Sequence, residues 1–346
     1  MQAQASAPPV QPVAQTSANA LITMDHVTKT FGSQNAVTDI TWQIEPGEIF
    51  GIVGPSGCGK TTAVRLMTGV YIPTSGTVTL LGKNPATFTA RDREQLGYMP
   101  QLFVLYPNLN VMENMRFAAS MYGVSPFKRR KRIDELINFV ELDKARKTQA
   151  VNISGGMQRR LQLAAALVHE PALLFADEPT AGIDPVLRGR FWDQFKELKA
   201  QGKSLVVTTQ YVSEVAYCDR VAVMRNGKLL MVDTPDNLRR RALGSDIISI
   251  RVDPEDVRNT LKILSHHPLV LNVERLRNAP FGSLAIYVEQ ANTAMADIIS
   301  SLAQDSTIDM RHVEEYKPPF DDVFIILMEK IEREEQAASA GAAQHG

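Results

Sequence analysis

The sequence predicts an α/β domain with a phosphate-binding loop, followed by a smaller α+β domain. A glycine-rich loop joins a predicted strand to a predicted helix near residue 54. Downstream of it, short apolar strands alternate with helices, which is typical of a sheet covered by helices. Beyond residue 244 the predicted elements follow the order β-α-β-β-α-β. A chain of 346 residues is long enough for about two such cores.

Composition and charge are those of an ordinary globular protein, with 44% hydrophobic and 22% charged residues. The formal net charge is -1, so no overall positive field attracts nucleic acid, and we expect no nucleic-acid partner. The sequence contains two cysteines, Cys58 and Cys218. Cys58 lies in the glycine-rich loop, where a disulfide would distort the backbone, so the sequence indicates a reducing, cytosolic compartment.

Both ends of the chain are predicted to be disordered. Residues 1–20 contain no charged side chain and lack the basic and apolar segments of a secretory signal. Residues 332–346 are mostly charged or small. No stretch approaches the roughly 18 to 20 apolar residues that a membrane-spanning helix needs. If the protein works at a membrane, another chain must span it.

The glycine-rich loop fits the pattern G-x-x-x-x-G-K-[ST] between a buried strand at 48–53 and a helix at 61–70. Its residues are Gly54, Pro55, Ser56, Gly57, Cys58, Gly59, Lys60, Thr61 and Thr62. Glycines let backbone N–H groups turn toward an anion, and the helix start adds its positive dipole end. Lys60 can reach the β- and γ-phosphates of a nucleotide, and the Thr61 hydroxyl can bind Mg²⁺. The alternative is a chance glycine-rich turn, which the flanking strand and helix disfavour.

Two side chains near this loop leave alternatives open. Phe31, between predicted strands at 21–27 and 36–44, could stack on an adenine base or fill a sheet edge. Cys58, beside the N–H donors of the loop, is expected to have a lowered thiol pKa and to react with alkylating reagents, unless it only fills space.

A helical stretch follows the strand that ends at Gln101 and covers residues 111–122 and 126–142. Four large apolar side chains recur there at near-helical spacing: Met112, Met115, Phe117 and Met121. Packing in a core is favoured over a groove that faces a partner. The basic run at 128–132 is interpreted as a solvated helix face, with contact to anionic lipid headgroups as the alternative.

Two later segments add chemistry to the phosphate loop. Ser154 is a candidate N-cap for a helix to about residue 169, and Gly155 and Gly156 leave the first N–H groups of that helix uncovered for an anion. An apolar strand at 172–176 ends in Asp177 and Glu178, which suits Mg²⁺ binding and a base for water. A helix at 185–201 then leads to a strand at 204–209, which ends at Gln210.

The C-terminal third predicts a small ferredoxin-like domain at 244–331. Its predicted strands and helices lie at 247–252, 254–264, 270–275, 284–288, 291–303 and 310–315, and a closing helix lies at 320–331. His266 and His267 have no acidic or thiol partners in range, so a solvated loop is favoured over a metal site.

Together these motifs resemble the nucleotide-binding domain of an ABC ATPase, a P-loop NTPase with a helical subdomain. The resemblance covers about residues 21–238, within a predicted domain of 21–243 whose helical subdomain spans about 102–169. The matching motifs are Walker A at Gly54–Thr62, the Q-loop at Gln101, the signature at Ser154–Gly156, Walker B at 173–178 and the D-loop at 181–184. Phe31 falls where the family has its adenine-stacking aromatic.

Two positions depart from the general pattern of the family. Met157 stands where a glutamine usually ends the signature, and Gln210 stands where a switch histidine usually follows the strand. Both departures, with Asp322-Val323-Phe324 near the C-terminus, resemble the ATPase subunits of the daunorubicin/doxorubicin-type exporters.

The resemblance implies a head-to-tail dimer, most simply a homodimer, that closes Walker A of one subunit and the signature of the other over ATP. Thr61, Gln101 and Asp177 would hold Mg²⁺, and Glu178 would orient and deprotonate the attacking water. Gln210 would donate one hydrogen bond to the γ-phosphate without titrating near neutral pH. Asp184 of the D-loop would also contact the nucleotide.

The function that the resemblance favours is the ATP-hydrolysing subunit of an exporter at the cytoplasmic face of the cell membrane, with its permease on a separate chain. The alternatives are a soluble ABC protein that acts in translation or DNA repair, an importer ATPase, and a subunit that binds ATP without hydrolysing it. One phosphate loop, one signature and the absence of sustained heptads disfavour the first. The cargo stays open among drug, lipid and polysaccharide.

Overall fold

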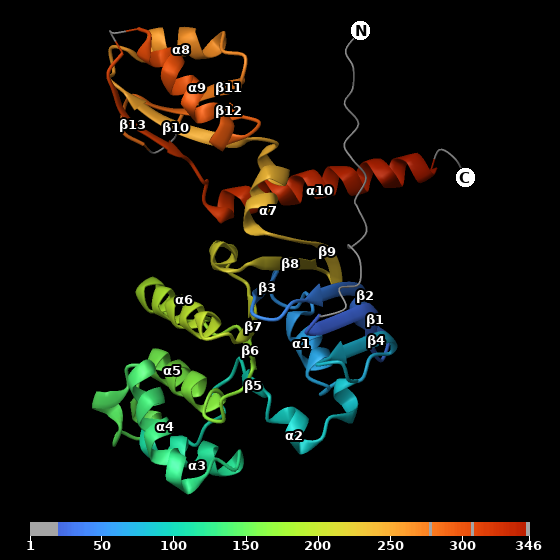
Figure 1. The fold of residues 1–346 in the computed structure, drawn as a ribbon. Coiled ribbons are helices and arrows are strands. Elements are labelled where there is room, and N and C mark those ends of the chain that lie inside the picture. Colours follow the sequence, from blue (N-terminus) through green and yellow to red (C-terminus); the bar gives the residue numbers. More distant parts are fainter. Residues whose placement is uncertain (1–19, 277–278, 306–307, 344–346) are drawn as a thin grey trace. The chain divides into compact units, whose positions relative to one another are not determined.

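The computed structural model describes residues 20–276, 279–305 and 308–343, and the chain divides into two compact units between Thr234 and Pro235 (Figure 1). The sequence placed this boundary after residue 243. The difference is helix α7 (Pro235–Leu243), which packs against α10 (Phe320–Ala343) in the second unit. Residues 1–19 of the predicted disordered leader lie outside the described residues.

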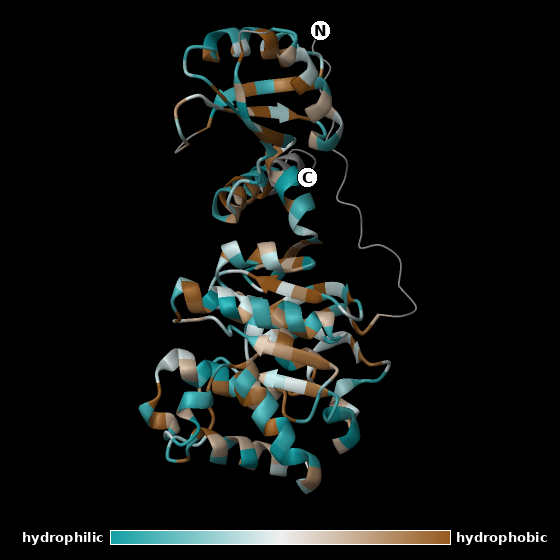
Figure 2. Cartoon of the chain, turned by 60° about the vertical axis from the view of Figure 1, so that its left-hand side comes forward, coloured by the Kyte–Doolittle hydropathy of each residue, from teal (hydrophilic) through white to brown (hydrophobic). Residues whose placement is uncertain are grey.

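The first unit contains a six-stranded sheet in the order β5-β6-β7-β3-β8-β9. Its strands are β3 (Ile49–Val53), β5 (Leu96–Met99), β6 (Leu173–Asp177), β7 (Ser204–Thr209), β8 (Arg220–Arg225) and β9 (Lys228–Asp233). All neighbours are parallel except β9, which pairs with β8 antiparallel. Every residue of β3, β6 and β7 is buried, in agreement with their largely apolar sequences. Figure 2 colours the chain by hydropathy, with hydrophobic residues in brown.

A second, antiparallel sheet has the order β2-β1-β4, formed by β1 (Ile22–Phe31), β2 (Gln34–Ile44) and β4 (Ser75–Leu80). Helix α1 (Lys60–Met67) contacts this sheet and also β6 of the six-stranded sheet. One buried cluster, which includes Trp42 and Phe50, fills the space between them. The phosphate loop is therefore held between two sheets that share a core.

Helices α3 (Val111–Met121), α4 (Pro126–Phe139) and α5 (Gly155–Ala166) lie within the range predicted for the helical subdomain. Met115 is buried, but Phe117 and Met121 are exposed, so the expectation that they pack in a core is wrong for these two. The shorter helices of the unit are η1 (Pro85–Thr87), α2 (Ala90–Arg93), η2 (Asp143–Ala145), η3 (Ala150–Asn152) and η4 (Val212–Tyr217), and α6 (Pro185–Ala200) packs against β3 and β7.

The second unit has a four-stranded antiparallel sheet in the order β11-β12-β10-β13. Its elements are β10 (Asp246–Val252), α8 (Val257–Ser265), β11 (Val270–Arg275), β12 (Ser283–Val288), α9 (Ala291–Ala303) and β13 (Met310–Glu315). The sheet packs against α8 and α9 around Ile248, Ile286 and Ile298.

Helix α10 corrects the predicted disordered tail. It continues through residues 332–343, which are rich in Ala and Glu, two strong helix formers. Residues 344–346 lie outside the described part. Within the part of the chain that the structure describes, no helix combines the length and the apolar character that crossing a membrane requires.

Candidate nucleotide site

The glycine-rich loop joins β3 to α1, and two of its glycines are required by the backbone. Gly59 has φ 104°, and a Cβ there would lie 2.6 Å from the Ala36 carbonyl oxygen. A Cβ at Gly54 would lie 2.2 Å from the Met224 carbonyl oxygen and 2.7 Å from Cys58 Sγ. Because both approaches are closer than side chains allow, the loop keeps its shape only with glycine at these positions.

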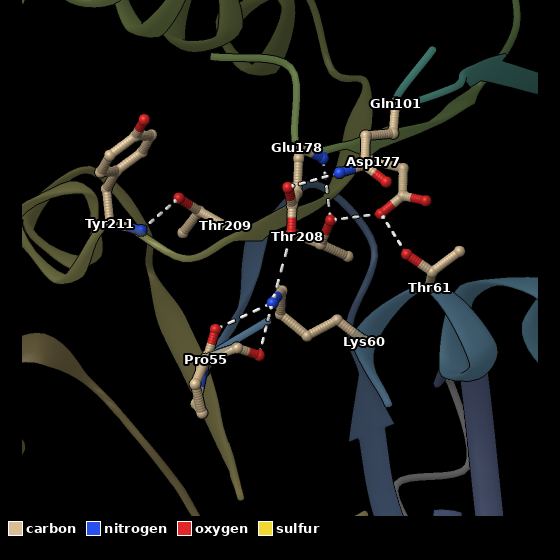
Figure 3. Close-up of polar contacts among 10 residues, drawn as sticks. Pro55, Lys60, Thr61, Gln101, Asp177, Glu178, Thr208, Thr209 and Tyr211 are labelled. Carbon is tan, nitrogen blue, oxygen red and sulfur yellow. Dashed lines mark hydrogen bonds and ion pairs between the residues drawn. The ribbon is translucent and has the colours of Figure 1, made fainter. Parts of the chain in front are cut away.

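Lys60 lies inside this loop, at the first position of α1. Its side chain is buried, and Nζ donates hydrogen bonds to the carbonyl oxygens of Gly54 (2.8 Å) and Pro55 (3.1 Å). Nζ also lies 3.3 Å from Glu178 Oε1, so Lys60 and Glu178 form an ion pair (Figure 3). The ammonium group is therefore held within the loop by two carbonyls and one carboxylate.

Thr61 and Asp177, two of the three predicted metal ligands, contact each other. The Thr61 hydroxyl donates to Asp177 Oδ1 at 3.1 Å, and the Thr208 hydroxyl donates to the same oxygen at 2.6 Å (Figure 3). Asp177 ends β6 and Thr208 lies in β7, so neighbouring parallel strands bring these groups together. Thr208 has no motif signal in the sequence, since its role depends on strand pairing.

Glu178 has both carboxylate oxygens occupied. Oε1 pairs with Lys60, and Oε2 accepts a 2.8 Å hydrogen bond from Gln101 Nε2. The backbone of Glu178 is in the left-handed region, with φ 46°, and its N–H donates to the Thr208 hydroxyl at 2.9 Å. Gln101, predicted as a metal ligand, thus contacts the predicted base rather than Thr61 or Asp177.

Lys60, Thr61, Gln101 and Glu178 line one pocket of about 530 Å³. Asp177, the hydrogen-bond partner of Thr61, does not line it. Its lining residues are Phe31, Gln34, Asn35, Ala36, Ser56, Gly57, Gly59, Lys60, Thr61, Thr62, Gln101, Glu178, Asn226 and Gly227. Phe31 is 44% exposed and touches the edge of the Tyr71 ring, with centroids 5.2 Å apart. Sequence reasoning missed Gln34 and Asn35 at the start of β2 and Asn226 in the turn between β8 and β9, which only the folded chain places beside the loop.

The remaining predicted site residues do not line this pocket. Ser154 caps α5 by accepting a hydrogen bond from the Met157 N–H, and Asp184 caps α6 by accepting one from the Leu187 N–H. The two helix starts are close, because a Cβ at Gly156 would lie 2.2 Å from the Leu187 side chain. Gln210 is exposed directly after β7. In a single chain, then, Ser154, Gly155, Gly156, Asp184 and Gln210 stand apart from the phosphate loop pocket.

Cys58 contradicts the expectation of a reactive thiol. Its side chain is buried, and burial raises the pKa of the thiol, although Lys60 and backbone N–H groups act in the opposite direction. Its sulfur occupies the space beside Gly54. Cys58 is therefore a small filling residue of the loop, the alternative that the sequence left open.

The fold and this pocket define a P-loop nucleotide-binding protein. A family model described as ABC transporter matches residues 37–181. The chain is 34% identical over 233 residues to the linearmycin resistance ATP-binding protein LnrL of Bacillus subtilis, which covers 67% of this chain and 75% of that protein. It is 34% identical over 248 residues to the Nod factor export ATP-binding protein I of Cupriavidus metallidurans, covering 71% and 82%. The chain therefore belongs to the family of ABC transporter ATP-binding proteins.

Further comparisons agree with this family. The chain is 36% identical over 231 residues to the probable multidrug ABC transporter ATP-binding protein YbhF of Escherichia coli, and the match spans 67% of this chain but only 40% of that relative. Among solved structures, an ATP-binding subunit of an ABC transporter aligns with TM-score 0.58 and 28% identity, covering 64% of this chain and 92% of that one. A dimeric ATP-binding cassette in a post-hydrolysis state, bound to ADP and Pi, aligns with TM-score 0.57 and 26% identity, covering 62% and 98%.

Proposed function

We propose that this chain is the ATP-hydrolysing subunit of an ABC exporter, and that it works as a dimer with a permease on a separate chain at the cytoplasmic face of the cell membrane. The observation that carries the proposal is the pocket lined by Lys60, Thr61 and Glu178, in which Lys60 pairs with Glu178. Thr61 in turn donates a hydrogen bond to Asp177. The names of relatives, which mention multidrug transport, linearmycin resistance and Nod factor export, support export.

The pocket fits a nucleotide. Its volume of about 530 Å³ lies within the range of small-molecule sites. The exposed Phe31 ring at its edge suits stacking on adenine, and the loop N–H groups with Lys60 suit the phosphates. Thr61 and Asp177 supply hydroxyl and carboxylate oxygens, the ligand types that Mg²⁺ prefers. Bound there, Mg²⁺ would neutralise negative charge that develops on the phosphates.

Glu178 is proposed as the group that orients and deprotonates water. Its carboxylate forms an ion pair with Lys60 of the phosphate loop. A γ-phosphate that binds Lys60 therefore competes with Glu178 Oε1 for the same ammonium group. Nucleotide binding would thus release one carboxylate oxygen for water, while the hydrogen bond from Gln101 keeps the other in place. Transfer of the γ-phosphoryl group to water then depends mainly on positioning and on stabilisation of charge.

Dimerisation is proposed because, in a single chain, some of the predicted nucleotide-binding residues lie away from the phosphate loop pocket. The α5 start at Ser154–Gly156 offers N–H groups and a positive dipole end but does not line the pocket. A second copy placed head to tail would bring these N–H groups to the γ-phosphate. In the same arrangement Asp184 and Gln210 would approach the nucleotide from the dimer interface.

The permease is proposed to dock beside Gln101. The loop that follows exposes Leu102, Val104 and Tyr106, and Phe117 and Met121 of α3 are exposed as well. Two buried amides fix this loop: Asn114 accepts a hydrogen bond from the Tyr106 N–H, and Gln162 donates to the Leu102 carbonyl. A partner bound to this apolar surface would be connected to Glu178 through Gln101.

For the second unit, the element order and the antiparallel sheet order support the prediction of a ferredoxin-like domain. We propose a role in dimerisation or regulation, and its sequence does not select between them. The transported substrate stays open among drug, lipid and polysaccharide, because cargo specificity would belong to the permease.

Two experiments test the proposal. Steady-state ATP hydrolysis by the full chain should require Mg²⁺ and disappear in Lys60→Ala, with Thr68→Val as a control at the far end of α1. Affinity purification of the tagged chain from detergent-solubilised membranes should recover a polytopic permease. Recovery with ribosomes or DNA would instead support a soluble ABC protein, and recovery with a substrate-binding protein would support an importer.

A further inference from the structure

A fully buried carboxylate connects the two segments that carry Glu178 and Gln210. Glu214 lies in η4, and its side chain has no exposed surface. Its Oε1 accepts a 2.6 Å hydrogen bond from the Thr180 hydroxyl and lies 3.5 Å from Arg188 Nε. Among the residues that the structure describes, Oε2 has no hydrogen-bond donor. Burial of a charge is costly unless it is paired, so these two contacts hold the carboxylate in place.

Thr180 connects Glu214 to the proposed base. It lies two residues after Glu178, and its side chain is buried. Glu178 has φ 46°, a strained conformation for a residue other than glycine, which persists only where the surroundings enforce it. Two contacts flank this backbone: the Glu178 N–H bonds Thr208 Oγ1 on one side, and Thr180 bonds Glu214 on the other.

Glu214 also holds the segment that follows Gln210. The Glu214 N–H donates to the Tyr211 carbonyl at 3.1 Å, and the Tyr211 N–H donates to Thr209 Oγ1 at 2.9 Å (Figure 3). The guanidinium of Arg188, the ion-pair partner of Glu214, lies 3.9 Å from the centre of the Tyr211 ring. Tyr211, the residue next to Gln210, therefore contacts both Glu214 and Arg188.

We propose that Glu214 is a positioning residue, which fixes the Glu178 segment and the Gln210 segment relative to each other through Thr180, Arg188 and Tyr211. The proposal rests on the catalytic roles given above to Glu178 and Gln210. The Glu214 side chain is buried and does not line the nucleotide pocket. It therefore acts by positioning Glu178 and Gln210 and does not contact the nucleotide. Its loss should lower kcat for ATP hydrolysis and leave KM for ATP unchanged.

The first test needs no activity. Hydrogen exchange of the full chain without nucleotide compares wild type with Glu214→Gln and with Thr180→Val. We expect amides at 179–183 and 211–217 to exchange at least fivefold faster in both variants, while other segments keep their rates. Faster exchange in one segment alone, or in neither, overturns the connection. Thr180→Val serves where Glu214→Gln does not fold, since it removes one hydroxyl and no charge.

The second test is kinetic. We expect Glu214→Gln and Thr180→Val each to lower kcat about tenfold, with KM within twofold of wild type and with a double variant no worse than the stronger single one. Thr180→Ser, which keeps the hydroxyl, should recover wild-type kcat. Thr260→Val removes a buried hydroxyl in the second unit and is the control. Unchanged kcat in a stably folded Thr180→Val overturns the proposal. A wild-type chain without ATPase activity would instead defeat the proposed function, and the exchange experiment would still test the connection.

Discussion

Replacing Glu178 by Gln should separate catalysis from binding. The amide keeps the shape of the side chain and a hydrogen bond with Gln101 but loses the charge that pairs with Lys60 at 3.3 Å. We expect ATP hydrolysis to fall on the order of a hundredfold, because an amide cannot accept a proton from water. ATP should bind at least as tightly as in wild type, because Lys60 no longer has to leave a carboxylate.

The structure also indicates how far Glu178→Gln should lower the free energy of unfolding. Removing one partner of a buried ion pair costs about 3–5 kcal/mol when nothing else compensates the remaining charge. Lys60 keeps two carbonyl acceptors, so we expect about 1–3 kcal/mol for the nucleotide-free chain. For a unit of this size that lowers the melting temperature by roughly 2–10 °C. Mg²⁺-ATP should remove the difference, because its phosphates replace the lost anion.

Thermal melting with and without Mg²⁺-ATP, binding of a fluorescent ATP analogue and steady-state ATPase activity are the assays. Glu48→Gln is a matched control, because Glu48 is as buried as Glu178, at 8% exposure, and lies 3.3 Å from its own partner, Arg220. The control should melt earlier in both conditions and keep wild-type ATP affinity and turnover. Weakened ATP binding by Glu178→Gln, or unchanged hydrolysis, would rule out the proposed role of Glu178.

Three further predictions concern single residues. Phe31→Ala should weaken ATP affinity about tenfold with little effect on kcat, since one exposed aromatic stack is worth about 1–2 kcal/mol; equal affinity in a binding titration would assign Phe31 to the sheet edge alone. Burial raises the pKa of Cys58, so its alkylation by maleimide should be slow at pH 7 and accelerate only above the ordinary thiol pKa. At neutral pH the labelling rate should be the same with and without ATP. Rapid labelling at pH 7 would contradict the structure. Gln210→His should make hydrolysis depend on pH near 6–7, where imidazole titrates, and an unchanged rate and pH profile would remove Gln210 from the site.

The sequence predicted the elements that carry strong local signals. The phosphate loop, the apolar strands that end at Asp177 and Thr209, and the helix starts at Ser154 and Asp184 were all visible as short patterns. Each depends on neighbours in the chain: glycines at a tight turn, a polar cap, or a fully buried strand. For this reason the order of strands and helices followed from the sequence in the second unit and, in the first unit, for the main elements up to β7. Strands β8 and β9 were not predicted.

Contacts across the fold were not predictable in the same way. Gln101 lies against Glu178 because neighbouring strands β5 and β6 end side by side, and helical spacing did not reveal that Phe117 faces outward. A motif rule placed Cys58 near N–H donors but missed the desolvation that raises its pKa. Helix α10 continues beyond its apolar part because Ala and Glu are strong helix formers.

In the proposed dimer, two copies of this chain close over ATP, and each copy completes the site of the other. Sedimentation velocity of the Glu178→Gln chain, which should bind ATP without consuming it, tests this directly. We predict a monomer without nucleotide, a dimer with Mg²⁺-ATP, and a monomer again when Ser154→Arg places a bulky cation at the α5 start. A Glu178→Gln chain that binds ATP and stays monomeric at every protein concentration would rule out this dimer.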